Sequence, residues 1–180
     1  FIRDDGNSNT PKGLRYWAPV ANVFAATNSG TPTLAQVDTD LNKSLFKLEN
    51  ANANMTSVGW VMAPRTFRYL SSIRDGNGNK AYPELDQGFL KGYRVGTTTQ
   101  VPVNLTVGSG STATADGSEI YLADFGDCFI GEDEQLLIDY SKEATYKDGS
   151  GNVISAFQRD QTLIRVIAKH DFGPRHVESI

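Results

Sequence analysis

A long amphipathic pattern in the first third of the chain limits the possible folds more than any other feature. Five apolar residues recur at steps of three and four: Leu34, Val37, Leu41, Leu45 and Leu48. This spacing places their side chains in one stripe along an α-helix, with charged and polar residues between them. Thr33 is a natural N-cap, and Gln36 three residues later completes a capping box. We predict a helix from about Leu34 to Asn50.

The period of the pattern changes after this helix. Residues 58–62 form a short continuous apolar run, which predicts a buried strand with Trp60 in the core. Pro64 suits the first turn of a second helix, whose apolar face would carry Phe67, Leu70 and Ile73. We expect that helix to end at about Arg74, where Asp-Gly begins a turn.

Most of the remaining chain has strand-like patterns. Residues 93–95 and 101–105 have short apolar alternations, and residues 120–141 predict two or three strands separated by turns at 126–127 and at the acidic Glu132–Glu134. Residues 156–172 contain no glycine or proline and predict one long strand. Residues 108–118 lack periodicity, which predicts a mobile surface loop. Two helices among mostly sequential strands indicate an α+β fold.

Three segments combine Asp-Gly with small polar residues: "DDGNSN" at 4–9, "RDGNGN" at 74–79 and "KDGSGN" at 147–152. In the second, Asp75, Asn77 and Asn79 have the spacing of the first ligands of a helix-flanked calcium loop. However, Lys80 stands where that loop needs glycine, and Asp86 stands where it needs glutamate. Asp, Asn and Gly are also favoured where a chain reverses. We interpret all three segments as turns and predict no metal site.

Composition excludes several classes of protein. The chain has 180 residues and a net charge of -4, and its 17 basic residues are scattered, which argues against a nucleic-acid surface. No apolar run approaches the ~20 residues that span a bilayer, so we expect a soluble protein. The single cysteine, Cys128, rules out an internal disulfide and leaves too few thiolates for a structural zinc site. Its phenylalanine neighbours favour a buried thiol.

No pattern of catalytic residues stands out. The only histidines are His170 and His176, and the sequence contains neither a Gly-x-Ser-x-Gly elbow nor a cysteine beside a histidine. The phosphate-binding glycine signatures are also absent. Trp17, beside Tyr16, could line a sugar site, and this alternative stays open. We predict no enzyme activity and no cofactor.

Five segments in a fixed order carry a family resemblance: "FIRDDGNSNTPKGLRYWA" at 1–18, "GWVMAPRTFRYLSSIRDGNGNKAYP" at 59–83, "LKGYRV" at 90–95, "IYLADFGDCFIGED" at 120–133 and "AFQRDQTLIRVIAKHDFGPRHV" at 156–177. Together they resemble the tailed-phage major capsid proteins, whose fold is named after a Hong Kong lambdoid phage. The chain departs from the family at Arg94-Val95, where proline is common, and at "ADFGD", where the usual order is Gly-Asp-Phe.

The resemblance implies an axial domain with a mixed sheet and flanking helices at 19–125. The peripheral domain would take 1–18 and, as return strands, most of 126–180. The family's arm, extended loop and spine helix would precede Phe1, as expected if the chain is part of a longer protein, so these residues alone should not assemble. Two turns would be subunit contacts. One, near a capsomer axis, contains Asp75, Asn77, Asn79 and Lys80; the other, near a three-fold contact, contains Lys147, Asp148 and Asn152.

By this resemblance the protein is a major head protein: a structural, self-assembling subunit of an icosahedral bacteriophage or prophage capsid that encloses the genome. Its partners would be other copies of itself, forming pentamers and hexamers in the full-length protein, with scaffolding, portal or decoration proteins as further candidates. No membrane and no sequence-specific nucleic acid would be bound. The protein would belong to the virion after assembly in the bacterial cytoplasm. The alternatives are a cargo-compartment shell protein of the same fold and a carbohydrate-binding or adhesive β-rich domain.

Overall fold

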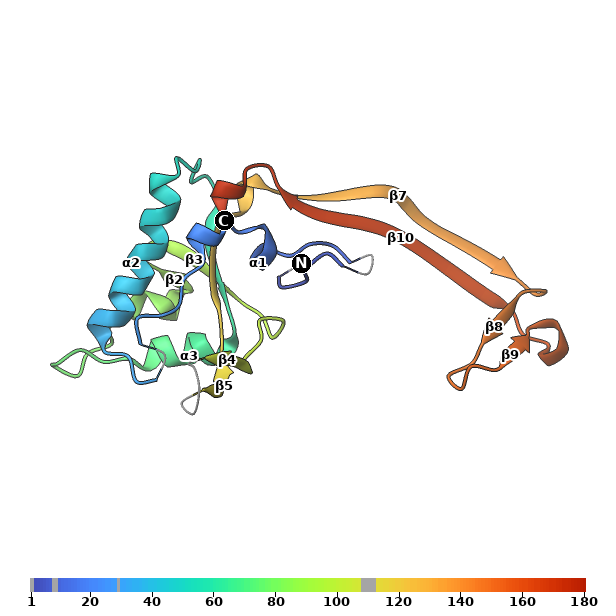
Figure 1. Cartoon of the computed structure of the whole chain (residues 1–180), viewed down its shortest axis with the longest axis horizontal. Coiled ribbons are helices and arrows are strands. Elements are labelled where there is room, and N and C mark those ends of the chain that lie inside the picture. Colours follow the sequence, from blue (N-terminus) through green and yellow to red (C-terminus); the bar gives the residue numbers. More distant parts are fainter. Residues whose placement is uncertain (1, 8–9, 29, 108–112) are drawn as a thin grey trace. The chain divides into compact units, whose positions relative to one another are not determined.

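The computed structural model describes residues 2–7, 10–28, 30–107 and 113–180, with only the backbone at 134 and 135. The chain divides into two units, shown in Figure 1. Unit 1 comprises Phe1–Phe129 and Phe172–Ile180, and unit 2 comprises Ile130–Asp171. The chain therefore leaves unit 1 once, builds unit 2 and returns.

A four-stranded mixed sheet forms the centre of unit 1. Its strand order is β2 (Phe89–Leu90), β3 (Tyr93–Thr97), β1 (Val58–Met62) and β6 (Ile120–Asp124). Strand β1 pairs parallel with β3 and antiparallel with β6, so that Trp60 lies opposite Val95 and Leu122. The predicted strand at 58–62 and the α+β class are thus confirmed.

Helices α2 (Leu34–Asn50) and α3 (Pro64–Ser72) pack on the sheet through one apolar cluster. The Thr33 side chain accepts from the Gln36 backbone N–H at 3.4 Å, and the Gln36 side chain accepts from the Thr33 N–H at 2.9 Å. The predicted helix and its capping box are therefore confirmed. Helix α3 ends two residues before the predicted Arg74. The cluster contains Leu41, Trp60, Met62, Leu70, Tyr82, Leu85 and Leu90.

A second apolar cluster is built from the alternate side chains of the same strands. Val61 packs against it while Trp60 belongs to the first cluster, as the two-residue period of a strand requires. The short helix α1 (Leu14–Trp17) and the C-terminal residues contribute most of its other members. The buried residues of the whole second cluster are Leu14, Ala63, Val101, Tyr121, Ala123, Phe172 and Ile180.

The N-terminal segment is held to this cluster by a close backbone approach. The Gly13 N–H donates to the Asp4 carbonyl at 2.8 Å, and a Cβ at Gly13 would lie only 2.7 Å from the carbonyl carbon of Ile2. Glycine is therefore required there. Arg3 pairs with Glu119 at 2.9 Å, which links the segment to the start of β6.

The rest of unit 1 consists of connections. Single 3₁₀ turns occur at Val20–Asn22, Pro83–Gln87, Phe125–Asp127 and Val177–Ser179. Strands β4 (Leu105–Val107) and β5 (Thr114–Gly117) form a hairpin. The prediction of a loop at 108–118 was therefore wrong for residues 114–117, which form β5 and pair with β4. Residues 108–112 lie outside the described residues.

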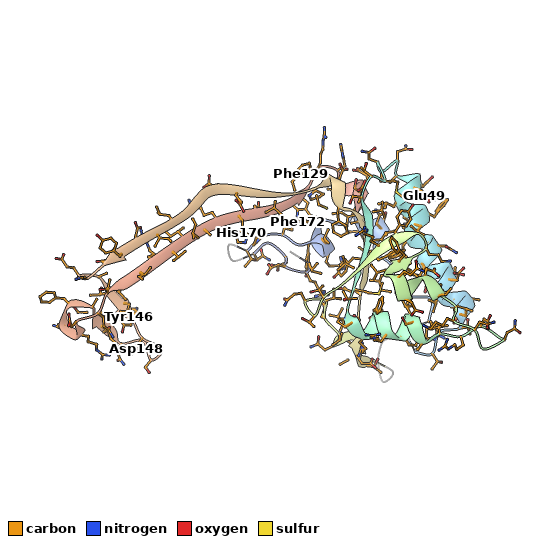
Figure 2. The ribbon with its side chains drawn as sticks, turned by 180° about the vertical axis from the view of Figure 1, so that it is seen from behind. Glu49, Phe129, Tyr146, Asp148, His170 and Phe172 are labelled. Carbon is orange, nitrogen blue, oxygen red and sulfur yellow. The ribbon has the colours of Figure 1, made fainter. Side chains whose placement is uncertain are left out.

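Unit 2 consists of a ribbon and a hairpin. The ribbon is the pairing of β7 (Cys128–Ser141) with β10 (Leu163–Pro174), of which residues 130–141 and 163–171 belong to unit 2. The hairpin joins β8 (Thr145–Lys147) to β9 (Val153–Ser155). Tyr146 and Asp148 lie on the hairpin (Figure 2).

Two sequence predictions in this unit were wrong. The acidic residues 132–134 do not form a turn, because β7 runs through them as one strand. The long strand begins at Leu163 and not at Ala156, because a 3₁₀ turn at Phe157–Arg159 ends at Asp160, whose φ is +51°. Aspartate tolerates this left-handed conformation better than most residues, so it can end the turn before β10 begins.

Candidate subunit-contact surfaces

In the turn at Asp75–Asn79, the Asp75 carboxylate accepts hydrogen bonds from later residues of the same turn. The Asp75 Oδ1 atom accepts the backbone N–H groups of Asn77 at 2.9 Å and Asn79 at 2.8 Å, and Asn79 Nδ2 donates to Asp75 Oδ2 at 3.3 Å. Two backbone bonds between Asp75, Gly78 and Asn79 complete the loop. Gly78 has a φ of +84°, a conformation that favours glycine.

The turn at Asp148–Asn152 repeats this arrangement in unit 2. Asp148 Oδ1 accepts from the backbone of Ser150 and Asn152, both at 2.9 Å, and Asn152 Nδ2 donates to Asp148 Oδ2 at 3.2 Å. Gly151, like Gly78, has a φ of +84°. The shared pattern Asp-Gly-x-Gly-Asn thus encodes one turn geometry twice.

These bonds engage the carboxylate oxygens that a calcium loop would use. The Asn79 N–H lowers the pKa of Asp75 most strongly, and the Asn152 N–H does the same for Asp148. Both carboxylates are ionised, but their oxygens face the donors of their own turn. Lys80 pairs with Asp86, so the twelfth position of the supposed loop also has a partner. Among the described residues, no three His, Cys, Asp or Glu side chains gather as metal ligands.

The ribbon of unit 2 presents two chemically different faces. Ion pairs between Arg165 and Asp139, at 2.8 Å, and between Lys169 and Asp133, at 3.4 Å, join odd-numbered residues across the strands. Successive side chains of a strand alternate between faces, so the even-numbered residues occupy the other face. These include Leu136, Ile138, Tyr140, Ile164 and Val166, whose exposed fractions lie between 55% and 80%.

An exposed apolar face of this kind is typical of a surface that binds another protein or another copy of the chain. Isolated two-stranded ribbons are only marginally stable in water, and contiguous exposed apolar patches mark interaction surfaces. The ion-paired face has already satisfied its charges. The apolar face of the ribbon, defined by the five residues above, is therefore the strongest candidate contact surface of unit 2. Sequence reasoning missed it because it predicted an acidic turn within β7.

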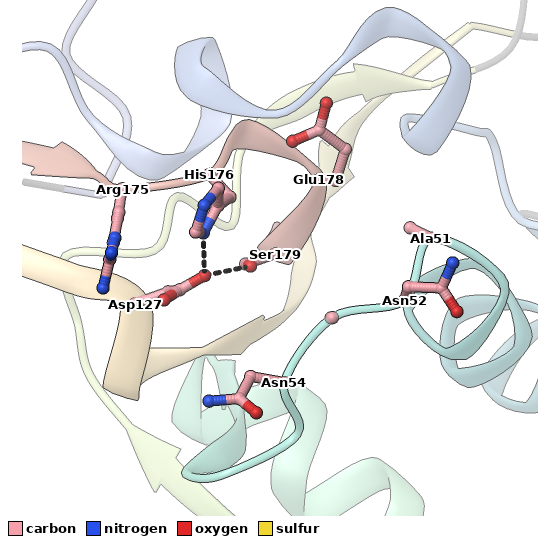
Figure 3. A pocket seen from close by; sticks show the side chains of 9 residues that line it. Ala51, Asn52, Asn54, Asp127, Arg175, His176, Glu178 and Ser179 are labelled. Atoms are coloured by element: carbon pink, nitrogen blue, oxygen red, sulfur yellow. Dashed lines mark hydrogen bonds and ion pairs between the residues drawn. The ribbon is translucent and has the colours of Figure 1, made fainter.

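A pocket of about 320 Å³ in unit 1 brings a serine, a histidine and an aspartate together (Figure 3). Ser179 Oγ donates to Asp127 Oδ2 at 2.6 Å, and His176 Nδ1 lies 2.9 Å from the same oxygen. The Ser179 and His176 contacts lower the pKa of Asp127, in that order. A catalytic triad needs the serine bonded to the histidine, whereas here both side chains bond the aspartate. In this arrangement Asp127 ties the C-terminal residues to the turn at Phe125–Asp127.

Trp17 and Cys128 also have structural surroundings. Trp17 Nε1 donates to the carbonyls of Lys12 at 3.0 Å and Phe172 at 3.2 Å, and the Lys12 ammonium lies over its ring. Its ring is therefore part of the packing of α1 and is not a free sugar platform. Cys128 is half-buried rather than fully buried, and burial raises the pKa of its thiol.

Comparisons with known proteins agree with this architecture. The family model of the phage capsid family matches residues 1–180. The major capsid protein of Klebsiella oxytoca phage phiKO2 is 44% identical over 181 residues, which cover 100% of this chain and 41% of that protein. The chain belongs to the phage capsid family. It spans about two-fifths of the length of this relative.

Solved structures show the same capsid fold at low identity. A chain from Mycobacterium phage Adephagia matches with a TM-score of 0.65 and 18% identity, covering 96% of this chain and 51% of that one. A chain from the capsid of an empty GTA particle matches with a TM-score of 0.64 and 15% identity, covering 99% and 57%. The resemblance inferred from the five segments is thereby confirmed, and the phage capsid family implies a structural role for the chain.

Proposed function

We propose that the protein is a structural subunit of a bacteriophage capsid and assembles with copies of itself to enclose the genome. The observation that carries this proposal is the apolar face of the ribbon, on a chain that belongs to the phage capsid family. In this role the full-length protein forms pentamers and hexamers in the virion after assembly in the bacterial cytoplasm. Scaffolding, portal or decoration proteins are further partners of such a shell.

The size of the apolar face fits a shell contact better than a stable dimer. A strand rises about 3.3 Å per residue and neighbouring strands lie about 4.8 Å apart, so the face covers only a few hundred Å². Stable isolated pairs bury about 1,200–2,000 Å² in total. Contacts of this size are weak singly and hold a closed shell through their number.

The two Asp-Gly-x-Gly-Asn turns are further contact points in this proposal. Each turn is already ordered by its own hydrogen bonds, so a contact there costs little additional conformational entropy. Lys80 and Lys147 stand beside the turns and add charge. We assign residues 19–125 to the axial domain, with the first turn, and most of 126–180 to the peripheral domain together with 1–18.

Electron microscopy of the full-length gene product tests the proposal. We expect closed shells or capsomer rings from the native sequence, and we expect Ile138→Lys to prevent them. Leu137→Lys is the matched control, because it places the same charge on the ion-paired face of the same strand. A native product that stays monomeric over a range of salt and protein concentrations would contradict the proposal.

A further inference from the structure

One segment of unit 1 reverses the acidic balance of the chain. The protein contains 21 acidic and 17 basic residues, yet residues 50–74 include no aspartate or glutamate and three arginines: Arg65, Arg68 and Arg74. The next acidic residue, Asp75, is bonded within its own turn. Overall net charge therefore says little about this part of the surface.

Helix α3 places these arginines on its solvent side. Arg65 and Arg68 are one turn apart, as neighbours on one helix face are, and both are exposed. Tyr69, 44% exposed, and Ser72 lie on the same side, whereas Leu70 on the opposite side is 2% exposed and packs on the sheet. Arg74 is exposed directly after the helix. We call Arg65, Arg68, Tyr69, Ser72 and Arg74 the basic face of α3.

The guanidinium groups of this face have no carboxylate partner within the described part of the chain. Arg65 donates to the backbone carbonyl of Asp116, and Arg68 lies over the ring of Phe67. Three arginines elsewhere are paired with carboxylates: Arg3 and Arg15 both contact Glu119, and Arg165 pairs with Asp139. The three arginines of the basic face thus keep most of their donors for an external anion.

We infer that the basic face of α3 binds the phosphate backbone of nucleic acid without reading its sequence. Duplex DNA carries one negative charge per ~1.7 Å of its axis, so a short cationic face can contact several phosphates. Arginine suits this contact because its planar fork matches phosphate oxygens. The acidic residues Asp133 and Asp139 of another copy are poorer partners, since both are already paired within the ribbon.

We expect a single chain to bind weakly, because it contacts only about three phosphates. Neutralising three phosphates gives a slope of about -2.7 in a plot of log affinity against log salt concentration. Many copies presented together on one surface would bind much more tightly than one chain. The inference concerns the single chain and does not depend on self-assembly.

Fluorescence anisotropy with a mixed-sequence DNA duplex tests this inference on the 180-residue chain. We expect salt-dependent binding with a slope between about -2 and -3, and a slope near zero for the variant Arg65→Gln, Arg68→Gln, Arg74→Gln. A matched control removes three exposed positive charges elsewhere: Arg94→Gln, Lys142→Gln and Arg159→Gln. This control has the same net charge and should keep the slope of the native chain.

Three results would overturn the inference. One is equal loss of binding in the variant and the control, which would show an effect of net charge alone. Another is absence of binding at low salt, and the third is tighter binding to a polyglutamate peptide than to the duplex. Arg68→Gln alone should reduce the magnitude of the slope by about one. Circular dichroism checks that each variant is folded. Shell formation is scored separately by microscopy, so failure of this inference and failure of the capsid function are distinguishable.

Discussion

Unit 1 and unit 2 use their apolar residues in opposite ways. Of the eighteen buried hydrophobic residues in the described part of the chain, only Ile154 and Ala156 belong to unit 2. Of the eighteen exposed large hydrophobic residues, nine belong to unit 2, at positions 130, 136, 137, 138, 140, 153, 157, 164 and 166. Unit 1 is therefore stabilised by its own core, whereas unit 2 leaves most of its large apolar side chains exposed.

This difference indicates that unit 2, and not unit 1, is the region whose folding can be coupled to assembly. A core such as that of unit 1 resists unfolding whether or not other copies are present. If the proposed shell contact buries the apolar face of the ribbon, the stability of unit 2 should rise as the shell forms.

Replacing Trp60 should destabilise unit 1 strongly. Trp60 is 1% exposed, and its Nε1 donates to the Leu90 carbonyl at 3.0 Å. We expect Trp60→Ala to lower the free energy of unfolding by about 3–5 kcal/mol in urea denaturation. Leu136→Ala, at a position 60% exposed, should change it by less than about 0.5 kcal/mol in the isolated chain. Similar losses from the two substitutions would contradict the division between the units.

Asp124 is a buried acidic residue of unit 1. Its carboxylate, in a residue 1% exposed, accepts the backbone N–H groups of Thr56, Ser57 and Gly126 at 3.0, 2.8 and 3.0 Å. Asp124→Asn would place its N–H₂ group against at least one of these donors, because only one of its two terminal atoms is an acceptor. We expect a loss of about 2–3 kcal/mol, measured by the same denaturation. An unchanged unfolding midpoint would show that the three bonds contribute little.

The sequence predicted unit 1 far better than unit 2, for a physical reason. Helix α2, its Thr33 cap and the strand around Trp60 are encoded by local periodicity and burial, which act within a few residues. The faces of the ribbon depend on which residues pair across more than twenty positions, as Asp139 and Arg165 do. The basic face of α3 was missed because the charges were assessed along the chain and not on a folded surface.

Acid should destabilise both units through aspartates with low pKa values. Hydrogen bonds lower the pKa of Asp75 and Asp127 in unit 1 and of Asp148 in unit 2, so these groups bind protons less readily when folded than when unfolded. Their stabilisation is fully present above the unfolded pKa of about 3.9 and is lost as the pH falls through the lower folded values. We expect a nearly constant unfolding midpoint from pH 7 to about 5 and a decrease below about 4.

Tryptophan fluorescence can assign part of this decrease to unit 1, because both tryptophans, Trp17 and Trp60, lie there. Asp127→Asn should make the acid dependence of the fluorescence midpoint shallower, whereas Asp148→Asn in unit 2 should leave it unchanged. The opposite pattern would show that the Asp127 contacts with Ser179 and His176 do not stabilise unit 1.

The two Asp-Gly-x-Gly-Asn turns give the smallest and most selective test, because one geometry occurs once in each unit. Asp75→Ala and Asp148→Ala each remove the acceptor of two backbone N–H groups. In the isolated chain we expect the amide hydrogens of Asn79 and Asn152 to exchange roughly three- to tenfold faster, by similar factors. In the assembled shell of the full-length protein, any turn that forms a subunit contact should be protected beyond its value in the isolated chain. Equal exchange in the two states at both turns would remove them from the set of contacts and leave the apolar face of the ribbon as the main surface of unit 2.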